Sequence, residues 1–162
     1  MHKASGKQIK VAYIVQELVT GGELYDYVAN SGAFPTPIVR YYMKQLLSGV
    51  FHMHEKGFAH RDLKCANILL DCNYDIKLVD MGFAKRVAGN DGTGWTNTVV
   101  GTVGHMAPQL HEGKAYQGIQ ADIFALGVIF FTLYAGHPPF DMASSNDGYY
   151  SKLQNHRTQA FW

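Results

Sequence analysis

Side chains suited to phosphate chemistry stand close together in the middle of the chain. Within the stretch His60–Asn67 lie a carboxylate (Asp62), an ammonium (Lys64) and an amide (Asn67), and a second carboxylate, Asp80, follows a short apolar run. An Asp can accept the proton of an attacking hydroxyl, and a Lys can hold a phosphate. An Asn and a second Asp can hold Mg²⁺ between phosphate oxygens. The spacing therefore favours phosphoryl transfer.

Two long helices are predicted on either side of these residues. The first begins near Thr36, the expected N-cap, with Pro37 at the first helical position. Apolar residues recur at helical spacing from there to Gly57, which is expected to end the helix. The second covers about residues 122–135, is apolar throughout and stops at Gly136. An apolar helix of this kind is expected in the core.

Short β elements and one loop complete the expected organisation. The run Val11–Val15 is rich in β-favouring residues and is predicted to be a strand. Ile68–Leu70 and Ile76–Val79 stand on either side of the turn-like Asp71–Asn73, which predicts a β-hairpin. The segment Val87–Thr98 is rich in Gly, Asn and Asp and is predicted to be a mobile loop.

The composition fits a single intracellular domain. With 162 residues, 47% of them hydrophobic, the chain can bury one core. The net charge of +1, with both signs dispersed, gives no indication of a nucleic-acid or membrane-surface partner. Two cysteines, Cys65 and Cys72, cannot build a disulfide framework, and Met1–Gly6 lacks the apolar core of a signal peptide. A cytoplasmic location is expected, and the apolar run Ile123–Ala135 is interpreted as a buried helix rather than a membrane span.

Five motifs, in this order along the chain, resemble those of the eukaryotic protein kinases. They are Tyr13–Leu24 with its Gly-Gly-Glu-Leu ending, His60–Asn67, Asp80-Met81-Gly82, the stretch from Gly101-Thr102 to Ala107-Pro108-Gln109, and the buried-helix residues Asp122, Phe124 and Gly127. The resemblance covers about residues 11–145. It implies an α+β fold, mainly helical, like the large C-terminal lobe of a kinase from the hinge onward, with a hinge strand and a short β-hairpin.

The resemblance implies a role for each matching residue. Asp62 matches the catalytic base, Lys64 the residue that neutralises the moving phosphoryl group, and Asn67 with Asp80 the Mg²⁺ ligands. Thr102 is grouped with these catalytic residues, because together with Lys64 it is typical of serine/threonine rather than tyrosine kinases.

A nucleotide site is implied in the same way. Leu69 matches the apolar floor under adenine, the backbone of Glu17 and Val19 matches the edge that hydrogen-bonds the base, and Glu23 matches the ribose contact. Gln16 would stand beside this pocket as the gatekeeper. The implied cofactors are ATP and Mg²⁺, and the implied partner is a protein substrate.

The resemblance also implies regulation by phosphorylation. Arg61 beside the catalytic base is typical of kinases in which a loop phosphate pairs with this arginine. Thr98, three residues before Gly101, matches the usual phosphorylated position, and Thr96 is the second choice. The hinge and the Gly-His-Pro-Pro-Phe turn resemble the calcium/calmodulin-dependent kinase group. Ala66 stands where that group places a substrate-reading Glu, so a preference for basic substrates is not implied.

Departures from the family pattern keep a second function open. Only ten residues precede Val11, too few for the small lobe with its glycine-rich loop and strand lysine. Residues 1–162 are therefore expected to be a partial kinase domain without the N-terminal lobe, which alone transfers phosphate slowly or not at all. Gln109, His105 and Met81 replace the family's Glu, Tyr and Phe. The alternative is a catalytically inactive, kinase-derived binding or scaffold module.

Two other groups of residues are expected to be structural. His52, His54 and His60 are close in sequence but lack the second histidine of a zinc helix motif, so His60 is expected to pack under the loop 60–67. Cys65 is expected to behave as a small hydrophobe. By resemblance, Asp122 is expected to hold the backbone of the same loop from below.

Overall fold

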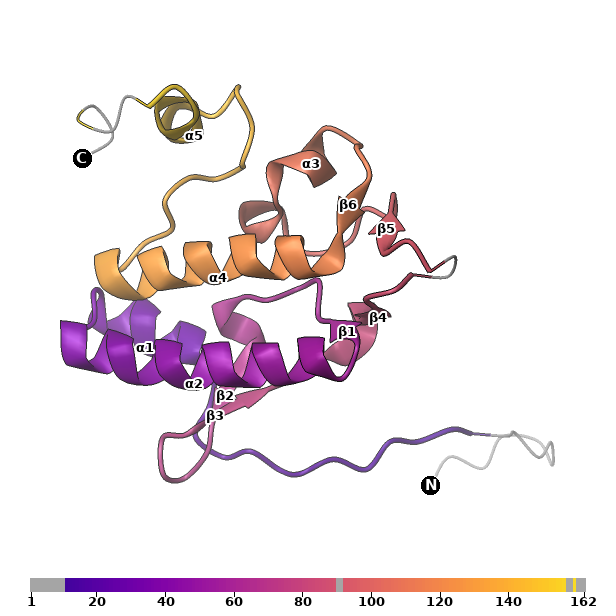
Figure 1. The fold of residues 1–162 in the computed structure, drawn as a ribbon. Helices are drawn as coiled ribbons and strands as arrows, with labels where there is room; N and C mark the ends of the chain where they lie inside the picture. The colour runs from indigo at the N-terminus through magenta and orange to yellow at the C-terminus, as the bar shows by residue number, and fades with distance from the viewer. Residues whose placement is uncertain (1–10, 90–91, 157–158, 160–162) are drawn as a thin grey trace, which may run out of the picture.

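The computed structural model describes residues 11–89, 92–156 and 159, and Figure 1 shows its fold. The helices are α1 (Leu24–Ser31), α2 (Thr36–Glu55), α3 (Pro108–His111), α4 (Gly118–Ala135) and α5 (Gly148–Gln154). The strands are β1 (Phe58–Ala59), β2 (Ile68–Leu70), β3 (Ile76–Leu78), β4 (Lys85–Arg86), β5 (Trp95–Thr96) and β6 (Tyr116–Gln117). Three single 3₁₀ turns are η1 (Cys65–Asn67), η2 (Met81–Phe83) and η3 (Val103–His105). The expectation for Met1–Gly6 lies outside the described residues.

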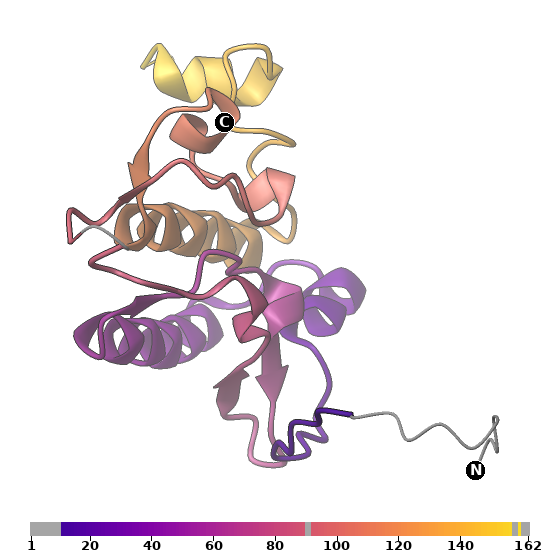
Figure 2. The same cartoon turned by 90° about the vertical axis from the view of Figure 1, so that its right-hand side faces the viewer.

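The two long helices, α2 and α4, lie one above the other at the centre of the molecule (Figures 1 and 2). The hairpin β2–β3 lies below α2, and α3 and α5 lie above α4, so that the elements stack in layers. The main core joins residues from both helices, α1, the loop at 60–67 and the hairpin: Leu24, Val28, Val39, Tyr42, Leu46, Val50, Leu63, Cys65, Ile68, Leu70, Ala125, Leu126, Ile129 and Leu133. The predicted α+β, mainly helical architecture is confirmed, with two-stranded sheets only among the described residues.

Helix α2 follows the predicted apolar spacing. Its buried residues lie three or four positions apart, so they form one face toward the core: Val39, Tyr42, Leu46 and Val50. The helix begins at Thr36 with Pro35 as its N-cap, one residue earlier than predicted. Pro37 stands in the first turn, where its missing N–H leaves no helical hydrogen bond unmade. The chain turns away at Gly57, whose φ of 81° is in the left-handed region.

Helix α4 is the predicted buried helix, but it begins at Gly118 rather than at 122. A Cβ on Gly118 would lie 2.6 Å from the Cβ of Ala59, so only glycine allows the first turn to approach β1 this closely. The helix ends, as predicted, at Gly136 with φ 80°. Among the described helices, α4 alone is long and apolar enough to cross a membrane. Its packing on α2 and its buried carboxylate Asp122 are features of a core helix.

The predicted hairpin is present. Strands β2 and β3 pair antiparallel with Ile68 opposite Leu78 and Leu70 opposite Ile76. One side chain organises the turn, since Asp71 Oδ1 accepts hydrogen bonds from the N–H groups of Asn73 (2.8 Å) and Asp75 (3.0 Å). This turn brings the strands into the register that buries Ile68 and Leu70 in the core.

The predicted hinge strand at Val11–Val15 is wrong. Residues 11–20 form no helix or strand, and the side chains of Val11, Tyr13, Ile14 and Val15 are each more than 80% exposed. A β-rich sequence forms a strand only when another strand pairs with it, and no described residue pairs with this run. The chain joins the fold at Gly21 and Gly22, which exchange backbone hydrogen bonds of 2.8 and 2.9 Å with Leu70.

The predicted loop Val87–Thr98 contains a short strand. Trp95 and Thr96 form β5, which pairs antiparallel with β6 at Gln117 and Tyr116. The pairing joins this segment to the residues just before α4. The end of the segment at Thr96 lies near the loop 60–67, because Thr96 and Arg61 line the same small cavity. Residues 90 and 91 lie outside the described part of the chain.

Candidate active site

A buried carboxylate on α4 supports the loop 60–67. Asp122 is 1% exposed and accepts hydrogen bonds from the backbone N–H groups of His60 (2.9 Å) and Arg61 (2.8 Å). The side chain of His54, from the end of α2, lies 2.7 Å from the same carboxylate. Arg61 has φ 68°, a left-handed conformation that costs energy in any residue except glycine. The three contacts of Asp122 stabilise this turn, as expected for a carboxylate below the loop.

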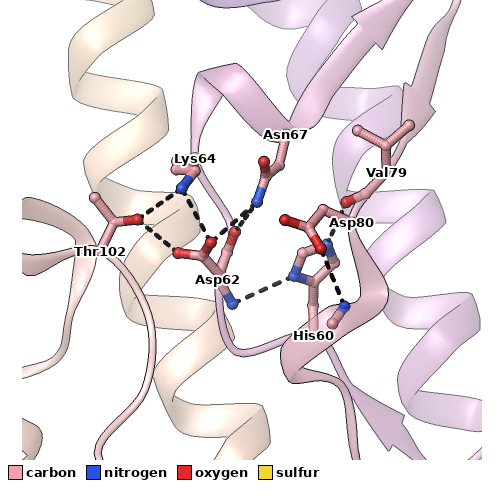
Figure 3. A network of polar contacts seen from close by, with 8 residues as sticks. His60, Asp62, Lys64, Asn67, Val79, Asp80 and Thr102 are labelled. Carbon is pink, nitrogen blue, oxygen red and sulfur yellow. Dashed lines mark hydrogen bonds and ion pairs between the residues drawn. The ribbon is translucent and has the colours of Figure 1, made fainter. Parts of the chain in front are cut away.

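The supported loop presents Asp62 to a closed ring of polar contacts (Figure 3). Thr102 donates its hydroxyl hydrogen to Asp62 Oδ1 (2.7 Å), and Lys64 Nζ lies 3.0 Å from Asp62 Oδ2. Lys64 also donates to Thr102 Oγ1 (2.8 Å). Asn67 Nδ2 donates to the backbone oxygen of Asp62 (2.8 Å) and to its carboxylate (3.2 Å). The four predicted catalytic residues therefore meet in one cluster, and Asp62 is only 5% exposed.

Glycine at position 101 lets the segment with Thr102 reach this cluster. Gly101 has φ 114°, and a Cβ there would lie 2.8 Å from the backbone oxygen of Arg61. Any other residue would be strained in conformation and would collide with the loop backbone. The close approach explains how Thr102, forty positions after Asp62, comes within hydrogen-bonding distance of it.

Asp80 lies beside the cluster, and its side chain bonds to Gly82 rather than to Asp62. The adjacent residue Val79 donates its backbone N–H to the backbone oxygen of Asn67 (3.1 Å), and its own backbone oxygen lies 3.0 Å from His60 Nε2. Asp80 has φ 60°, and its Oδ1 accepts from the N–H of Gly82 (3.1 Å). Asn67 and Asp80 thus provide oxygen donors on one side of Asp62, and such donors suit Mg²⁺. No larger cluster of metal-binding side chains exists among the described residues.

An open groove of about 960 Å³ contains most of the predicted nucleotide residues. Glu17, Val19, Leu69 and Asp80 all line it, and so does Gln16. The groove has a size typical of small-molecule sites. Glu23 is not among the lining residues, although its backbone forms a β-bridge with Leu69, which does line the groove. The groove also extends along α2, where sequence reasoning identified no site residue: Tyr41, Lys44, Gln45, Ser48, Gly49 and Met53.

Arg61 and Thr98 are joined by a residue that the sequence did not single out. The Tyr116 hydroxyl donates to the backbone oxygen of Thr98 (2.7 Å) and accepts from Arg61 Nη1 at 3.5 Å. Arg61 Nε donates to the backbone oxygen of Phe83 (2.7 Å). The Thr98 hydroxyl accepts from Thr96 at 3.3 Å, so the structure does not place it directly on Arg61. In the sequence, the position of Tyr116 just before an apolar helix was the one signal that could have singled it out.

Burial shifts the pKa of two residues that adjoin the cluster. Burial raises the pKa of the Cys65 thiol to about 12, so the thiol stays protonated near pH 7, as expected for a small hydrophobe. Burial lowers the pKa of His105, the nearby charge of Asp62 raises it, and the charge of Lys64 lowers it further. His60 is fully buried under the loop, as predicted.

Comparisons with known proteins point to one family. The family model "Protein kinase domain" matches residues 3–161. CBL-interacting serine/threonine-protein kinase 9 of Arabidopsis thaliana is 42% identical over 132 residues, which are 80% of this chain and 29% of the relative. CBL-interacting protein kinase 30 of Oryza sativa subsp. japonica is 38% identical over 141 residues, 87% of this chain and 29% of the relative. CBL-interacting protein kinase 32 of the same plant is 37% identical over 155 residues, 96% of this chain and 35% of the relative.

The chain therefore belongs to the protein kinase domain family. Its matched relatives include kinases of the serine/threonine type, in agreement with the resemblance found in the sequence. The chain spans about a third of the length of these relatives.

Proposed function

We propose that this chain carries the phosphoryl-transfer site of a serine/threonine protein kinase, which moves the γ-phosphate of ATP to a protein hydroxyl. The observation that carries the proposal is the closed cluster of Asp62, Lys64 and Thr102. Asp62 orients the substrate hydroxyl and accepts its proton. Lys64 neutralises charge on the transferred group, and Thr102 holds both side chains in position. The residues 1–162 form part of a kinase domain.

We further propose that Asn67 and Asp80 hold Mg²⁺. Their side chains offer the hard oxygen donors that this ion prefers, and their shared neighbour Val79 keeps the two segments together. When bound, Mg²⁺ supplies positive charge between phosphate oxygens. Leu69, Glu17 and Val19 line the groove in which the adenine would lie, and Glu23 would contact the ribose.

We propose that Thr98 is the regulatory phosphorylation site and that its phosphate pairs with Arg61. The link through Tyr116 supports this, because the residue that contacts Arg61 also holds the backbone of Thr98. Thr96 is the second candidate, since its hydroxyl accepts from Lys85 Nζ (3.2 Å) beside a small cavity that Arg61 also lines. A new phosphate near two cations gains charge-assisted hydrogen bonds.

The proposed partners are ATP and a protein substrate, in the cytoplasm, without nucleic acid or membrane. The dispersed charges and the net charge of +1 support the exclusion of a polyanionic partner. The two free thiols, Cys65 and Cys72, support a reducing compartment.

The test is Mg²⁺-dependent transfer from labelled ATP to a generic protein substrate by the purified chain and by Asp62→Asn. The expected result is slow transfer by the wild type that falls about 10²–10⁴-fold in the variant, because the hydroxyl loses its proton acceptor. Asp26→Asn, an exposed carboxylate on α1, is the matched control and should transfer like the wild type. Unfolding in urea checks that both variants fold.

Two results would contradict the proposal. Transfer that persists unchanged in Asp62→Asn would remove this residue from the chemistry. Mg²⁺-dependent binding of ATP, measured by calorimetry, without transfer by any form would support the inactive binding or scaffold module instead.

A further inference from the structure

His105 has a buried ring nitrogen without a hydrogen-bond partner. The Nδ1 atom is shielded from solvent, and no described residue donates to it or accepts from it. Most buried polar atoms in proteins are paired, so an unpaired one calls for a physical explanation. An unpaired lone-pair acceptor already costs free energy, but it costs less than an unpaired donor on a charged ring. It cannot carry a proton at the same cost, because a buried N–H without an acceptor is strongly unfavourable.

The position of His105 couples its ring to the catalytic cluster. His105 ends the turn η3 and donates its backbone N–H to the backbone oxygen of Thr102 (2.8 Å). Thr102 in turn holds Asp62 and Lys64 through its hydroxyl. The ring also lines a small cavity between this turn, the loop 60–67 and α4. A movement of the ring out of this site would therefore move the turn that carries Thr102.

Charged groups line this cavity from two of the elements around it. The loop 60–67 contributes Arg61 and Asp62 to the cavity, and α4 contributes Asp122. Burial has the largest effect on the ring and lowers the pKa of His105, while the charge of Asp62 raises it and the charge of Lys64 lowers it. Asp122 is already paired with His54 and two backbone N–H groups, and Asp62 with Lys64 and Thr102. Neither carboxylate pairs with His105 in the structure, so a proton on the ring would lack a partner.

We propose that His105 is a positioning residue that keeps Thr102 on Asp62 only while its imidazole is neutral, so that protonation of this ring stops phosphoryl transfer. The inference rests on the proposed function, and it concerns the regulation of the same site. Of the ordinary side chains, the imidazole titrates closest to neutral pH, so a support that depends on a neutral imidazole is pH-dependent.

The direction of the pH effect follows from burial. Burial lowers the pKa of His105 below its ordinary value of 6.5. Between that value and the lower folded value, the unfolded chain binds a proton that the folded chain does not. The contribution of His105 to stability is therefore complete above pH 6.5 and is lost as the pH falls through the folded pKa.

The first experiment follows the ring of His105 and the backbone amide of Thr102 by NMR between pH 4.5 and 8, in the full chain and in His105→Gln. In the wild type, the ring signal and the Thr102 amide signal should titrate with one midpoint below 6.5. In the variant, which lacks the imidazole, the Thr102 signal should show no transition at that midpoint. His52→Gln, which replaces an exposed histidine on α2, is the matched control and should leave the titration unchanged. If His105→Gln fails to fold, His105→Tyr restores the family residue and serves the same purpose.

The second experiment measures the pH dependence of phosphoryl transfer in the same proteins. Below the midpoint of the His105 titration, the rate of the wild type should fall relative to that of His105→Gln. The ratio of the two rates should change about tenfold for each unit by which the pH decreases. A midpoint at or above 6.5, or a Thr102 signal that does not follow the ring, would overturn the inference. A constant rate ratio would also overturn it. Absence of transfer by every form at every pH, with a normal NMR titration, would instead contradict the proposed kinase function.

Discussion

The loop 60–67 and the segment 11–20 differ in how the fold holds them. The loop lies between the two long helices, and a buried carboxylate, Asp122, satisfies its backbone. The segment exposes its apolar side chains, with Leu18 86% exposed, and its described attachments are the exposed ion pair between Glu17 and Lys77 (3.2 Å) and the junction at Gly21. Both regions carry residues of the proposed site.

The difference separates the two ends of that site. The phosphate-handling end, at Asp62, Lys64 and Asn67, is preorganised by core contacts and can stabilise charge without rearrangement. The proposed adenine edge, at Glu17 and Val19, lines the groove from a chain that no described strand pairs. Positions that a motif identifies equally well can therefore differ greatly in how firmly the fold holds them.

Hydrogen exchange should give the largest contrast between the two regions. No backbone N–H of residues 11–20 donates a hydrogen bond to another described residue, whereas those of His60 and Arg61 donate to Asp122. The latter amides should exchange at least about 10³-fold more slowly, because they open only with the core. Mass-spectrometric or NMR exchange measures both. Equal protection of Ile14 and His60 would break the comparison.

Removal of the support below the loop should strongly destabilise the protein. In Asp122→Ala, two backbone N–H groups and His54 lose their acceptor, and the free energy of unfolding should fall by about 3–5 kcal/mol. Urea unfolding measures the change. Asp141→Ala removes an exposed carboxylate and should change it by less than about 0.5 kcal/mol. Similar values for the two variants would mean that Asp122 does not support the loop.

A smaller loss is expected when Thr102 is held away from the loop. Gly101→Ala introduces both an unfavourable φ and a Cβ 2.8 Å from the oxygen of Arg61. The free energy of unfolding should fall by about 2–3 kcal/mol, with a parallel loss of phosphoryl transfer. Gly113→Ala is the matched control, because Gly113 also has a positive φ (65°) but its Cβ would meet nothing within 4 Å. That variant should lose only about 1 kcal/mol, and an equal loss in both would exclude the steric effect.

The smallest effect is expected in the exposed segment. Leu18→Ser replaces a side chain that is 86% exposed, so the free energy of unfolding should change by less than about 0.5 kcal/mol. Leu70→Ala, at a fully buried leucine, is the comparison and should cost about 2–5 kcal/mol. The same urea titration measures both variants. A large loss in Leu18→Ser would show that the segment is part of the core.

Local patterns in the sequence predicted the elements that depend on local spacing. The apolar repeat before Gly57 predicted α2, the run before Gly136 predicted α4, and the turn at Asp71 predicted the hairpin. The β-rich run at Val11–Val15 failed because a strand needs a partner elsewhere in the chain. The start of α4 was missed because the first turn is set by its approach to Ala59.

By itself, the sequence determined which side chains could carry the chemistry. Asp62, Lys64 and Asn67 lie within one short loop, so their spacing was visible without a structure. The family resemblance added Thr102 and Asp122, and the structure shows the contacts by which they hold the loop. Only the tertiary structure decided which further residues join them: His54, Tyr116 and His105 with its buried Nδ1 atom. The physical reason is that helical periodicity and turn chemistry act over a few residues, whereas hydrogen-bond partners, burial and the resulting pKa shifts depend on how remote segments pack.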